Sequence, residues 1–390
     1  MGPRFDISRR LKELPPYLFV EMDRAKKEAV EKGRDVIDLG VGDPDQPTPR
    51  FIIDAFHRAT LDAKTHAYPS NKGLPELRIA IAQWYKSRFG VELNPDDEIL
   101  PLIGSKEGIA HMPLAFINPH DAVLVPEPCY PPYKSGVIFA GGEVSIMPLL
   151  GRNNFLPDLG AVKSSLLSRT KLMFLNYPNN PTAATAEPKF FSEVVRFAEK
   201  NNIIVCHDAA YSEISFDGYK PTSFLAVDRA REVGIEFHSL SKTFNMTGWR
   251  IGFACGNAHL IEGLAKIKSN IDSGIFNAVQ MAGVEALKKA RVISAKNSRF
   301  YQKRRDVLVN GLRKLGWNVP KPKASFYVWA PVLKRYTSVT MARELLERAD
   351  LVVTPGNGFG QSGEGYVRMS LTVDESRLAE AVKRIGKVIS

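Results

Sequence analysis

The stretch KLMFLNYPNNPTAATAEPKFFSEVVRFAEKNNIIVCHD (171–208) decides the fold. Its two ends, KLMFLNYP (171–178) and NIIVCHD (202–208), are nearly continuous apolar runs, which is typical of strands buried on both faces. Between them, the segment 187–202 repeats apolar residues at helical spacing, namely Phe190, Phe191, Val194, Val195 and Ala198. A strand, a helix and a strand in this order predict parallel pairing with a right-handed crossover.

Two further apolar runs, DAVLVP (121–126) and EFHSLS (236–241), have the same character. We therefore predict an α/β fold, in which a large domain has a mostly parallel sheet covered by helices. The C-terminal third predicts a smaller α+β unit, because a long helical pattern at about 279–314 precedes short strand-like runs and a last helix. Those runs are FYVWAPV (326–332), DLVVTPG (350–356) and YVRMSLT (366–372).

The N-terminal segment contains a helical pattern at about 18–32 and the strand-like VIDLGVG (36–42). We expect it to pack against the C-terminal unit rather than to form a third domain. The predicted division is a small domain of residues 1–45 and 286–390 and a large, cofactor-binding domain of residues 46–285.

The composition indicates a water-soluble globular protein. Of the 390 residues, 44% are hydrophobic and 24% are charged, and no apolar run approaches the ~20 residues of a membrane-spanning helix. The start MGPRFDISRRLKELPP lacks the apolar stretch of a signal peptide. The three scattered cysteines, Cys129, Cys206 and Cys255, do not suggest a disulfide framework, so we expect a cytoplasmic protein without a membrane partner.

The net charge of +11 arises in the C-terminal segment. Residues 286–390 hold 21 Lys and Arg against 8 Asp and Glu, whereas the rest of the chain is nearly neutral. No zinc-finger, RRM or basic-zipper pattern accompanies this charge. We therefore interpret it as a solvated helix face and expect no nucleic-acid partner.

Polar and aromatic residues follow each of the four predicted strands, where ligands bind in open parallel sheets. Taken singly, each has a structural explanation as a turn former, a helix cap or a surface lysine. Their joint position at one sheet edge favours a functional site. The residues are Tyr130 and Tyr133 after strand 121–126, Asn180 after strand 171–178, Asp208 and Tyr211 after strand 202–208, and Ser239, Ser241, Lys242 and Arg250 after strand 236–241.

This set suits pyridoxal phosphate chemistry. A lysine amine condenses with the aldehyde, an acid holds the ring nitrogen protonated, and an aromatic side chain stacks on the ring. The phosphate needs hydroxyls, an arginine and the amides of a helix start. GSKEGIAHMPLAF (104–116) follows the strand-like EILPLI and opens a helical pattern, so Gly104, Ser105 and Lys106 suit a phosphate.

At these residues the sequence resembles the class I/II, fold-type I, pyridoxal-phosphate-dependent aminotransferases. NYPNNPT, HDAAY and SLSKTFNMTGWRIG match the family's signatures in order and spacing, and GLPELRIAIAQWY and YVRMSL extend the resemblance over nearly the whole chain. The family often has Asn-Pro-Thr-Gly where this chain has Asn-Pro-Thr-Ala. Ala183 therefore leaves the geometry of this turn open, although it touches no expected cofactor contact.

The resemblance implies a role for each matching residue. Lys242 is the lysine that binds the cofactor and moves the proton at Cα, and Asp208 pairs with the pyridine nitrogen. The phenolate oxygen contacts Tyr211 and Asn180, and Tyr130 stacks on the ring. The remaining implied contacts are Ser105, Lys106, Ser239, Ser241 and Arg250 around the phosphate, Tyr68 reaching the neighbouring subunit's phosphate in a homodimer, and Arg368 with Gly42 at the substrate α-carboxylate.

LGVGDPDQPTP (39–49), LPPYLF (14–19), GSKEGIAH and EPCYPPYKSG resemble the LL-diaminopimelate aminotransferase subgroup of this family, which serves lysine biosynthesis. By this resemblance Tyr17 and Asn277, with Lys106, contact the substrate. The distal end of diaminopimelate is itself an amino acid and needs polar partners. The acceptor implied by the family is a 2-oxo acid, here 2-oxoglutarate.

Other activities remain open at this point. The same fold and lysine serve aspartate, alanine and aromatic aminotransferases and C–S lyases, so the fold alone does not decide. Ser239-Leu-Ser-Lys242 also satisfies S-x-x-K, but the K-T-G and S-D-N elements of penicillin-binding proteins are absent. The G-x-G-x-x-G run at Gly358, Gly360 and Gly363 precedes a strand-like segment, so we predict a loop there and not a dinucleotide site. No His/Cys cluster has metal-ligand spacing, and we expect no metal.

Overall fold

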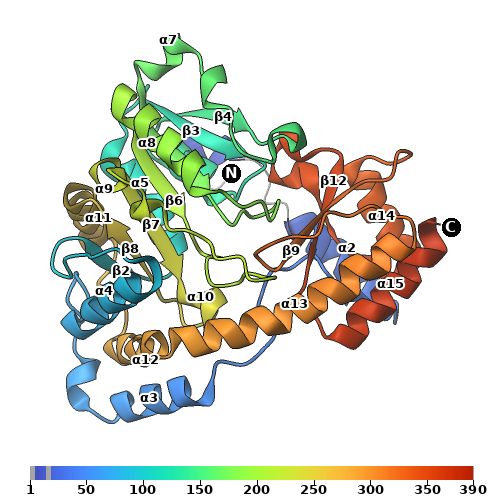
Figure 1. The fold of residues 1–390 in the computed structure, drawn as a ribbon, viewed down its shortest axis with the longest axis horizontal. Helices are drawn as coiled ribbons and strands as arrows, with labels where there is room; N and C mark the ends of the chain where they lie inside the picture. The colour runs from blue at the N-terminus through green and yellow to red at the C-terminus, as the bar shows by residue number, and fades with distance from the viewer. Residues whose placement is uncertain (1–4, 15–18, 390) are drawn as a thin grey trace.

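The computed structural model describes residues 5–14 and 19–389 (Figure 1). Its centre is a seven-stranded sheet with the strand order β2-β8-β7-β6-β5-β3-β4. All neighbouring pairs from β7 to β4 are parallel, whereas β8 is antiparallel to both of its neighbours. The predicted mostly parallel sheet is thus confirmed. The strands are β2 (Ile99–Leu102), β3 (Ala122–Glu127), β4 (Glu143–Pro148), β5 (Thr170–Asn176), β6 (Ile204–Asp208), β7 (Gly234–Ser239) and β8 (Gly252–Gly256).

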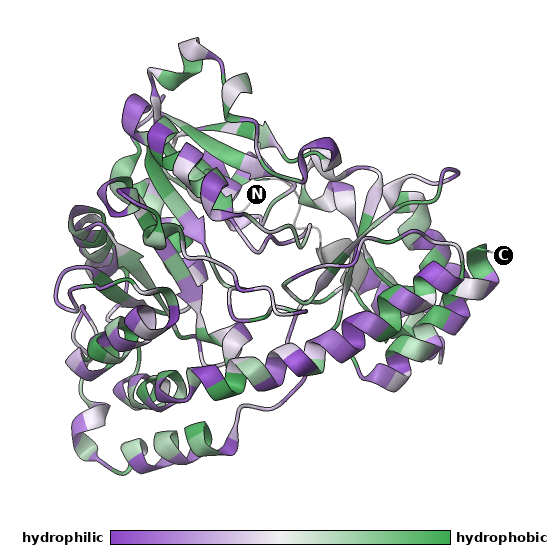
Figure 2. Cartoon of the chain, in the orientation of Figure 1, coloured by the Kyte–Doolittle hydropathy of each residue, from purple (hydrophilic) through white to green (hydrophobic). Residues whose placement is uncertain are grey.

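Both faces of this sheet are buried. In β5, Leu172 and Phe174 belong to one hydrophobic core and Met173 and Leu175 to another, because alternate side chains point to opposite faces. Figure 2 shows hydrophobic residues concentrated along these central strands. The first core is closed by α5 (Ser105–Phe116), α6 (Pro132–Phe139) and α11 (Ala258–Ile271), and the second by α4 (Pro75–Phe89), α8 (Pro188–Asn201) and α12 (Asn277–Lys288).

The C-terminal part forms a separate layer with its own core. An antiparallel sheet has the order β11-β12-β9, and β1 from the N-terminal segment pairs in parallel with β10. N-terminal Ile37 and Leu39 belong to this same core. The elements are β1 (Ile37–Asp38), β9 (Tyr327–Pro331), β10 (Leu351–Val352), β11 (Thr354–Pro355), β12 (Tyr366–Ser370), α13 (Ala290–Lys314), α14 (Ser338–Ala349) and α15 (Glu375–Ile389).

The long helix α13 connects the two parts (Figure 1). Near its start Ile293 packs on a core of the large sheet, whereas Tyr301 and Leu308 lie in the core of the small one. The helical pattern predicted at about 279–314 is two helices, because the chain leaves helical geometry at Lys289, with φ −108° and ψ 13°. The boundaries at residues 45/46 and 285/286 stay a prediction.

The basic C-terminal segment is only partly a solvated face. Arg304 and Arg305 are buried, with exposed fractions of 1% and 0%. Arg304 forms a bidentate ion pair with Asp45, with two N–O distances of 2.7 Å. Arg305 pairs with Asp217 at 2.7 and 3.0 Å. These two ion pairs therefore connect α13 to the N-terminal segment and to the segment that follows β6, and the interpretation as a solvated face is wrong for Arg304 and Arg305.

The remaining segments are short or peripheral. The run containing Gly358, Gly360 and Gly363 forms two 3-10 turns that lead into β12, which confirms the predicted loop. Within the described ranges, no helix has the length and apolar character needed to cross a bilayer. The other helices are α1 (Arg9–Lys12), α2 (Phe19–Glu31), α3 (Arg50–Thr60), α7 (Ser164–Leu167), α9 (Ala230–Val233) and α10 (Leu240–Thr243), with the 3-10 turns η1 (Ala63–His66), η2 (Gly151–Asn153), η3 (Leu159–Ala161), η4 (Phe224–Ala226), η5 (Gly356–Phe359) and η6 (Gln361–Gly363).

Candidate active site

A cavity of about 440 Å³ lies at the carboxyl edge of the large sheet. The ends of β5, β6 and β7 and the first turn of α5 meet there with the segment after β1 and with β9, η5 and β12. The cavity is thus enclosed by both parts of the chain. The lining residues are Val41, Gly42, Asp43, Ser105, Lys106, Tyr130, Pro131, Asn180, Asp208, Ala210, Tyr211, Ser239, Ser241, Lys242, Thr247, Arg250, Tyr327, Phe359 and Arg368.

Most of the residues selected from the sequence line this one cavity. The strand order explains why: β3, β5, β6 and β7 are parallel neighbours, and β2 points the same way because two antiparallel pairings with β8 separate it from β7. Their carboxyl ends therefore share an edge. The selected residues in the lining are Gly42, Ser105, Lys106, Tyr130, Asn180, Asp208, Tyr211, Ser239, Ser241, Lys242, Arg250 and Arg368.

Five selected residues are not among the lining residues, namely Tyr17, Tyr68, Gly104, Tyr133 and Asn277. Tyr68 is 90% exposed, so its side chain does not contribute to the cavity of its own chain. Asn277 is buried, and its side-chain amide donates to the carbonyl of Ala67 at 3.3 Å, next to Tyr68. Tyr17 lies outside the described residues.

Asp208 ends β6 with its carboxylate buried in the cavity wall. The hydroxyl of Tyr133 donates to Oδ2 at 2.8 Å, and the backbone N–H of Ala210 donates to Oδ1 at 3.2 Å. Burial raises the pKa of Asp208, and these two hydrogen bonds only partly oppose that effect. A buried carboxylate in this state is stabilised by a cationic partner in the cavity.

Lys242 follows β7 directly, in the short helix α10. Its Nζ donates to the carbonyl of Gly42 at 3.1 Å. Burial lowers the pKa of Lys242 to about 8; the negative charge of Asp43 opposes this shift, and the positive charges of Arg250 and Arg368 add to it. At neutral to mildly alkaline pH, a considerable fraction of this amine is therefore unprotonated and nucleophilic.

A further part of the cavity lining is suited to an anion. Helix α5 begins there, and the N–H groups of its first turn carry partial positive charge. Gly104 precedes the helix with φ 78°, and a Cβ at this position would lie 2.3 Å from Nη2 of Arg250, so only glycine allows this approach. Hydroxyls and cations surround the helix start, namely Ser105, Lys106, Ser239, Ser241 and Arg250.

Arg368 reaches the cavity from β12 and is 2% exposed. It donates from Nη1 to the side-chain oxygen of Asn180 at 2.8 Å and from Nη2 to the carbonyl of Gly40 at 2.6 Å. Its guanidinium lies 4.2 Å from the ring centroid of Tyr327 and 4.7 Å from that of Phe359. Among the described residues its buried Nε has no hydrogen-bond partner, so a ligand carboxylate can satisfy it.

Several lining residues were not selected from the sequence. Tyr327, on β9, places its hydroxyl 3.2 Å from that of Tyr211, and a Cβ on Gly42 would lie 1.9 Å from it. Gly42 is thus required for Tyr327 to reach the cavity. Asp43 stands in the LGVGDPDQPTP motif and was available as a signal, whereas nothing in the local pattern distinguishes Tyr327, Thr247 or Phe359 from ordinary strand and loop residues.

The turn at Ala183 adopts the left-handed conformation, with φ 56°. Its N–H donates to the carbonyl of Asn179 at 2.9 Å, and its methyl group is buried in the small core with Tyr211. Alanine therefore occupies a backbone geometry that glycine adopts at lower cost. The structure thus defines the geometry of the turn at Ala183, which the sequence left open.

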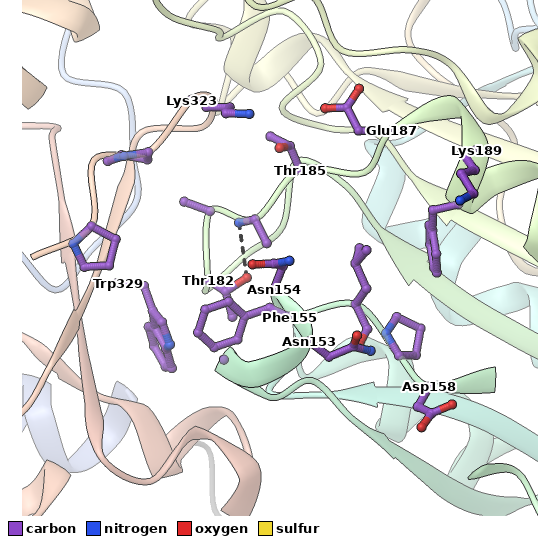
Figure 3. Close-up of a pocket in the computed structure, with 18 of the residues that line it drawn as sticks. Asn153, Asn154, Phe155, Asp158, Thr182, Thr185, Glu187, Lys189, Lys323 and Trp329 are labelled. Atoms are coloured by element: carbon purple, nitrogen blue, oxygen red, sulfur yellow. Dashed lines mark hydrogen bonds between the residues drawn. The ribbon is translucent and has the colours of Figure 1, made fainter. Parts of the chain in front are cut away.

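A larger groove of about 1350 Å³ lies elsewhere, beside the turn that contains Ala183 (Figure 3). Trp329 and Lys323 lie on one side of it, and Asn154, Phe155 and Glu187 come from the large sheet's loops. None of the residues selected from the sequence lines it. We therefore assign the chemistry to the smaller cavity, where an amine, a buried carboxylate and an anion site converge.

The chain is similar to known proteins over nearly its whole length. The family described as aminotransferase class I and II matches residues 34–385. The chain is 54% identical over 382 residues to an LL-diaminopimelate aminotransferase of Moorella thermoacetica, covering 98% of both chains. It is 55% identical over 379 residues to one of Syntrophobacter fumaroxidans, covering 97% of this chain and 98% of the relative.

Solved structures share the whole fold. Substrate-bound BacF from Bacillus subtilis superposes with a TM-score of 0.95 at 39% identity and covers 98% of both chains. A mutant aspartate aminotransferase from Thermus thermophilus superposes with a TM-score of 0.92 at 31% identity, over 99% of this chain and 100% of the other.

The lowered pKa of Lys242 can be measured without cofactor. In the cofactor-free protein, acetic anhydride should acetylate Lys242 with a pH midpoint of about 8, because only the neutral amine reacts and burial disfavours its charge. Peptide mass spectrometry of samples labelled between pH 6 and 11 gives the midpoint. A midpoint near 10.4, the ordinary value of a lysine, would contradict the environment described here.

Proposed function

The chain belongs to the aminotransferase class I and II family, and on this premise we propose that it binds pyridoxal 5′-phosphate and transfers an amino group from LL-2,6-diaminopimelate to 2-oxoglutarate. The products are tetrahydrodipicolinate and glutamate, a step of lysine biosynthesis. The observation that carries the proposal is one cavity lined by Lys242, Asp208 and the anion-binding start of α5. The names of the Moorella and Syntrophobacter relatives support the choice of substrate.

The residues of the cavity fit this cofactor. Among the described residues, the amine of Lys242 forms its hydrogen bond with a backbone carbonyl, that of Gly42, and it is available to an aldehyde. The buried carboxylate of Asp208 needs a cationic partner, which a protonated ring nitrogen provides. The start of α5 with Ser105 and Arg250 provides donors for a phosphate dianion. We propose that the remaining contacts are Lys106, Ser239 and Ser241 at the phosphate, Asn180 and Tyr211 at the phenolate oxygen, and Tyr130 against the ring.

Pyridoxal phosphate, when bound, supplies a ring that accepts the electrons of a broken Cα–H bond. The protein's own tasks are to keep that ring protonated and to move protons. We propose that Asp208 holds the ring-nitrogen proton, since its carboxylate is buried and already oriented by Tyr133. Lys242 would take the Cα proton of the substrate and deliver a proton to the carbon on the other side of the substrate nitrogen, a role that suits an amine with a pKa of about 8.

The substrate's α-carboxylate needs a planar, two-donor partner. Arg368 is already fixed by Asn180 and Gly40, and its buried Nε is unpartnered among the described residues. We propose that Arg368 clamps this carboxylate beside Gly42. The same clamp serves the oxo acid in the second half of the reaction, because donor and acceptor share the α-carboxylate group.

The exposed Tyr68 supports a homodimer with shared sites. Tyr68 is 90% exposed, and Leu61, Ile271 and Phe276 are exposed apolar residues in nearby elements. Gly274 packs against Pro69, so the 271–276 segment adjoins the Tyr68 segment. We propose that a second copy covers these residues, that Tyr68 reaches that copy's cofactor phosphate, and that Asn277 and Tyr17 contact the distal end of a substrate.

A substrate panel tests the proposed reaction. With 2-oxoglutarate as acceptor, LL-diaminopimelate should give glutamate and tetrahydrodipicolinate with a kcat/KM at least about 100-fold above those of aspartate, alanine and phenylalanine, because a site built for a polar distal end rejects substrates that lack it. Meso-diaminopimelate belongs in the same panel. A higher kcat/KM for aspartate, alanine or phenylalanine than for LL-diaminopimelate would contradict the proposed substrate. Pyruvate formed from a sulfur amino acid without an oxo acid would indicate a lyase.

Mixed dimers test the role of Tyr68. Lys242→Ala and Tyr68→Ala variants should each be nearly inactive, whereas dimers that combine one copy of each should contain one intact site. Random mixing should therefore restore about a quarter of wild-type activity in a closed two-fold dimer. The control is each variant unfolded and refolded alone. Mixing that restores nothing, although mixed dimers form by native mass spectrometry, would contradict a shared site.

A further inference from the structure

Asp43 is a carboxylate of the cavity lining that has no role in the proposed reaction. The carboxylates in the lining are Asp43 and Asp208. Asp208 accepts hydrogen bonds from Tyr133 and Ala210. No described residue forms a hydrogen bond or a salt bridge with the side chain of Asp43. Asp43 is exposed, and its negative charge acts on the amine of Lys242, whose pKa it raises.

The backbone around Asp43 is held in place on both sides. The carbonyl of Gly42 accepts from Lys242 at 3.1 Å, and that of Val41 accepts from Thr372 at 2.9 Å. On the other side, Asp45 is bound through both oxygens by the buried Arg304. The backbone that carries this carboxylate is therefore already ordered before a ligand binds.

The charges of the cavity leave one ammonium group of the proposed substrate without an anionic partner. The proposed substrate carries two ammonium and two carboxylate groups. In the proposed site, Arg368 binds the α-carboxylate, the start of α5 binds the cofactor phosphate, and the α-amino group reacts beside Lys242. The second ammonium group still requires an anionic acceptor, and Asp43 is the lining carboxylate that remains.

We propose that Asp43 accepts the distal ammonium group of a diamino diacid substrate and thereby selects it over an amino diacid of the same length. This inference rests on the proposed function. Asp43 also repels the distal carboxylate of glutamate and 2-oxoglutarate, so the residue favours one substrate and disfavours the other.

The opposite signs of these two effects make the test specific. Asp43→Asn should lower the ratio of kcat/KM for LL-diaminopimelate to that for L-2-aminopimelate, which lacks only the distal ammonium group, by about 10–100-fold, the usual effect of a lost charge-assisted hydrogen bond. The same variant should lower the KM for 2-oxoglutarate. Asp43→Glu should restore part of the ratio, and Glu347→Gln, an exposed carboxylate outside the cavity, serves as the matched control.

Each alternative outcome is recognisable. If the wild-type enzyme does not use LL-diaminopimelate at all, the proposed function fails. If the wild type prefers LL-diaminopimelate over L-2-aminopimelate and Asp43→Asn keeps the same ratio, the role of Asp43 is overturned while the function stands. If Asp43→Asn lowers kcat/KM equally for all donors and shifts the pH profile, Asp43 acts on the amine of Lys242 and does not select the substrate, which also overturns the proposal. Far-ultraviolet circular dichroism of each variant checks that it is folded.

Discussion

The parallel pairing of β6 with β7 is the constraint on which the site depends. Asp208 lies opposite Phe237 in this pairing, and Lys242 lies three residues after the end of β7. Because the strands run in the same direction, the carboxylate and the amine emerge at the same sheet edge. Burial then acts on them in opposite ways, raising the pKa of Asp208 and lowering that of Lys242. The same buried environment thus gives a carboxylate that a cationic partner would stabilise and an amine that is more easily deprotonated.

The small C-terminal layer completes the site that the large sheet begins. Arg368 from β12 and Tyr327 from β9 enter the cavity from that side, and the segment after β1 closes it. Hydrogen bonds from Arg368 to Asn180 and from Lys242 to Gly42 cross between the two layers. The proposed carboxylate clamp and the proposed cofactor lysine are therefore both in contact with residues of the other layer.

The selected residues that follow the parallel strands line one cavity because the strand order places them at the same sheet edge. Once apolar runs predict buried parallel strands, whatever follows each strand must meet at one edge, as Asn180 and Asp208 do. Tyr327 escaped prediction because its approach depends on the absence of a side chain at Gly42, a contact between residues 285 positions apart. The burial of Arg304 and Arg305 escaped it for a similar reason, since their partners Asp45 and Asp217 are distant in sequence. The helix break at Lys289 has no glycine or proline to indicate it.

The identity of the reacting amine tests the account most directly. The protein is reconstituted with pyridoxal 5′-phosphate, reduced with borohydride and digested, and the peptides are mapped by mass spectrometry. We expect a stable phosphopyridoxyl adduct on Lys242, the buried amine that lines the same cavity as Asp208. An adduct on Lys106 or on a surface lysine, with Lys242 unmodified, would contradict it.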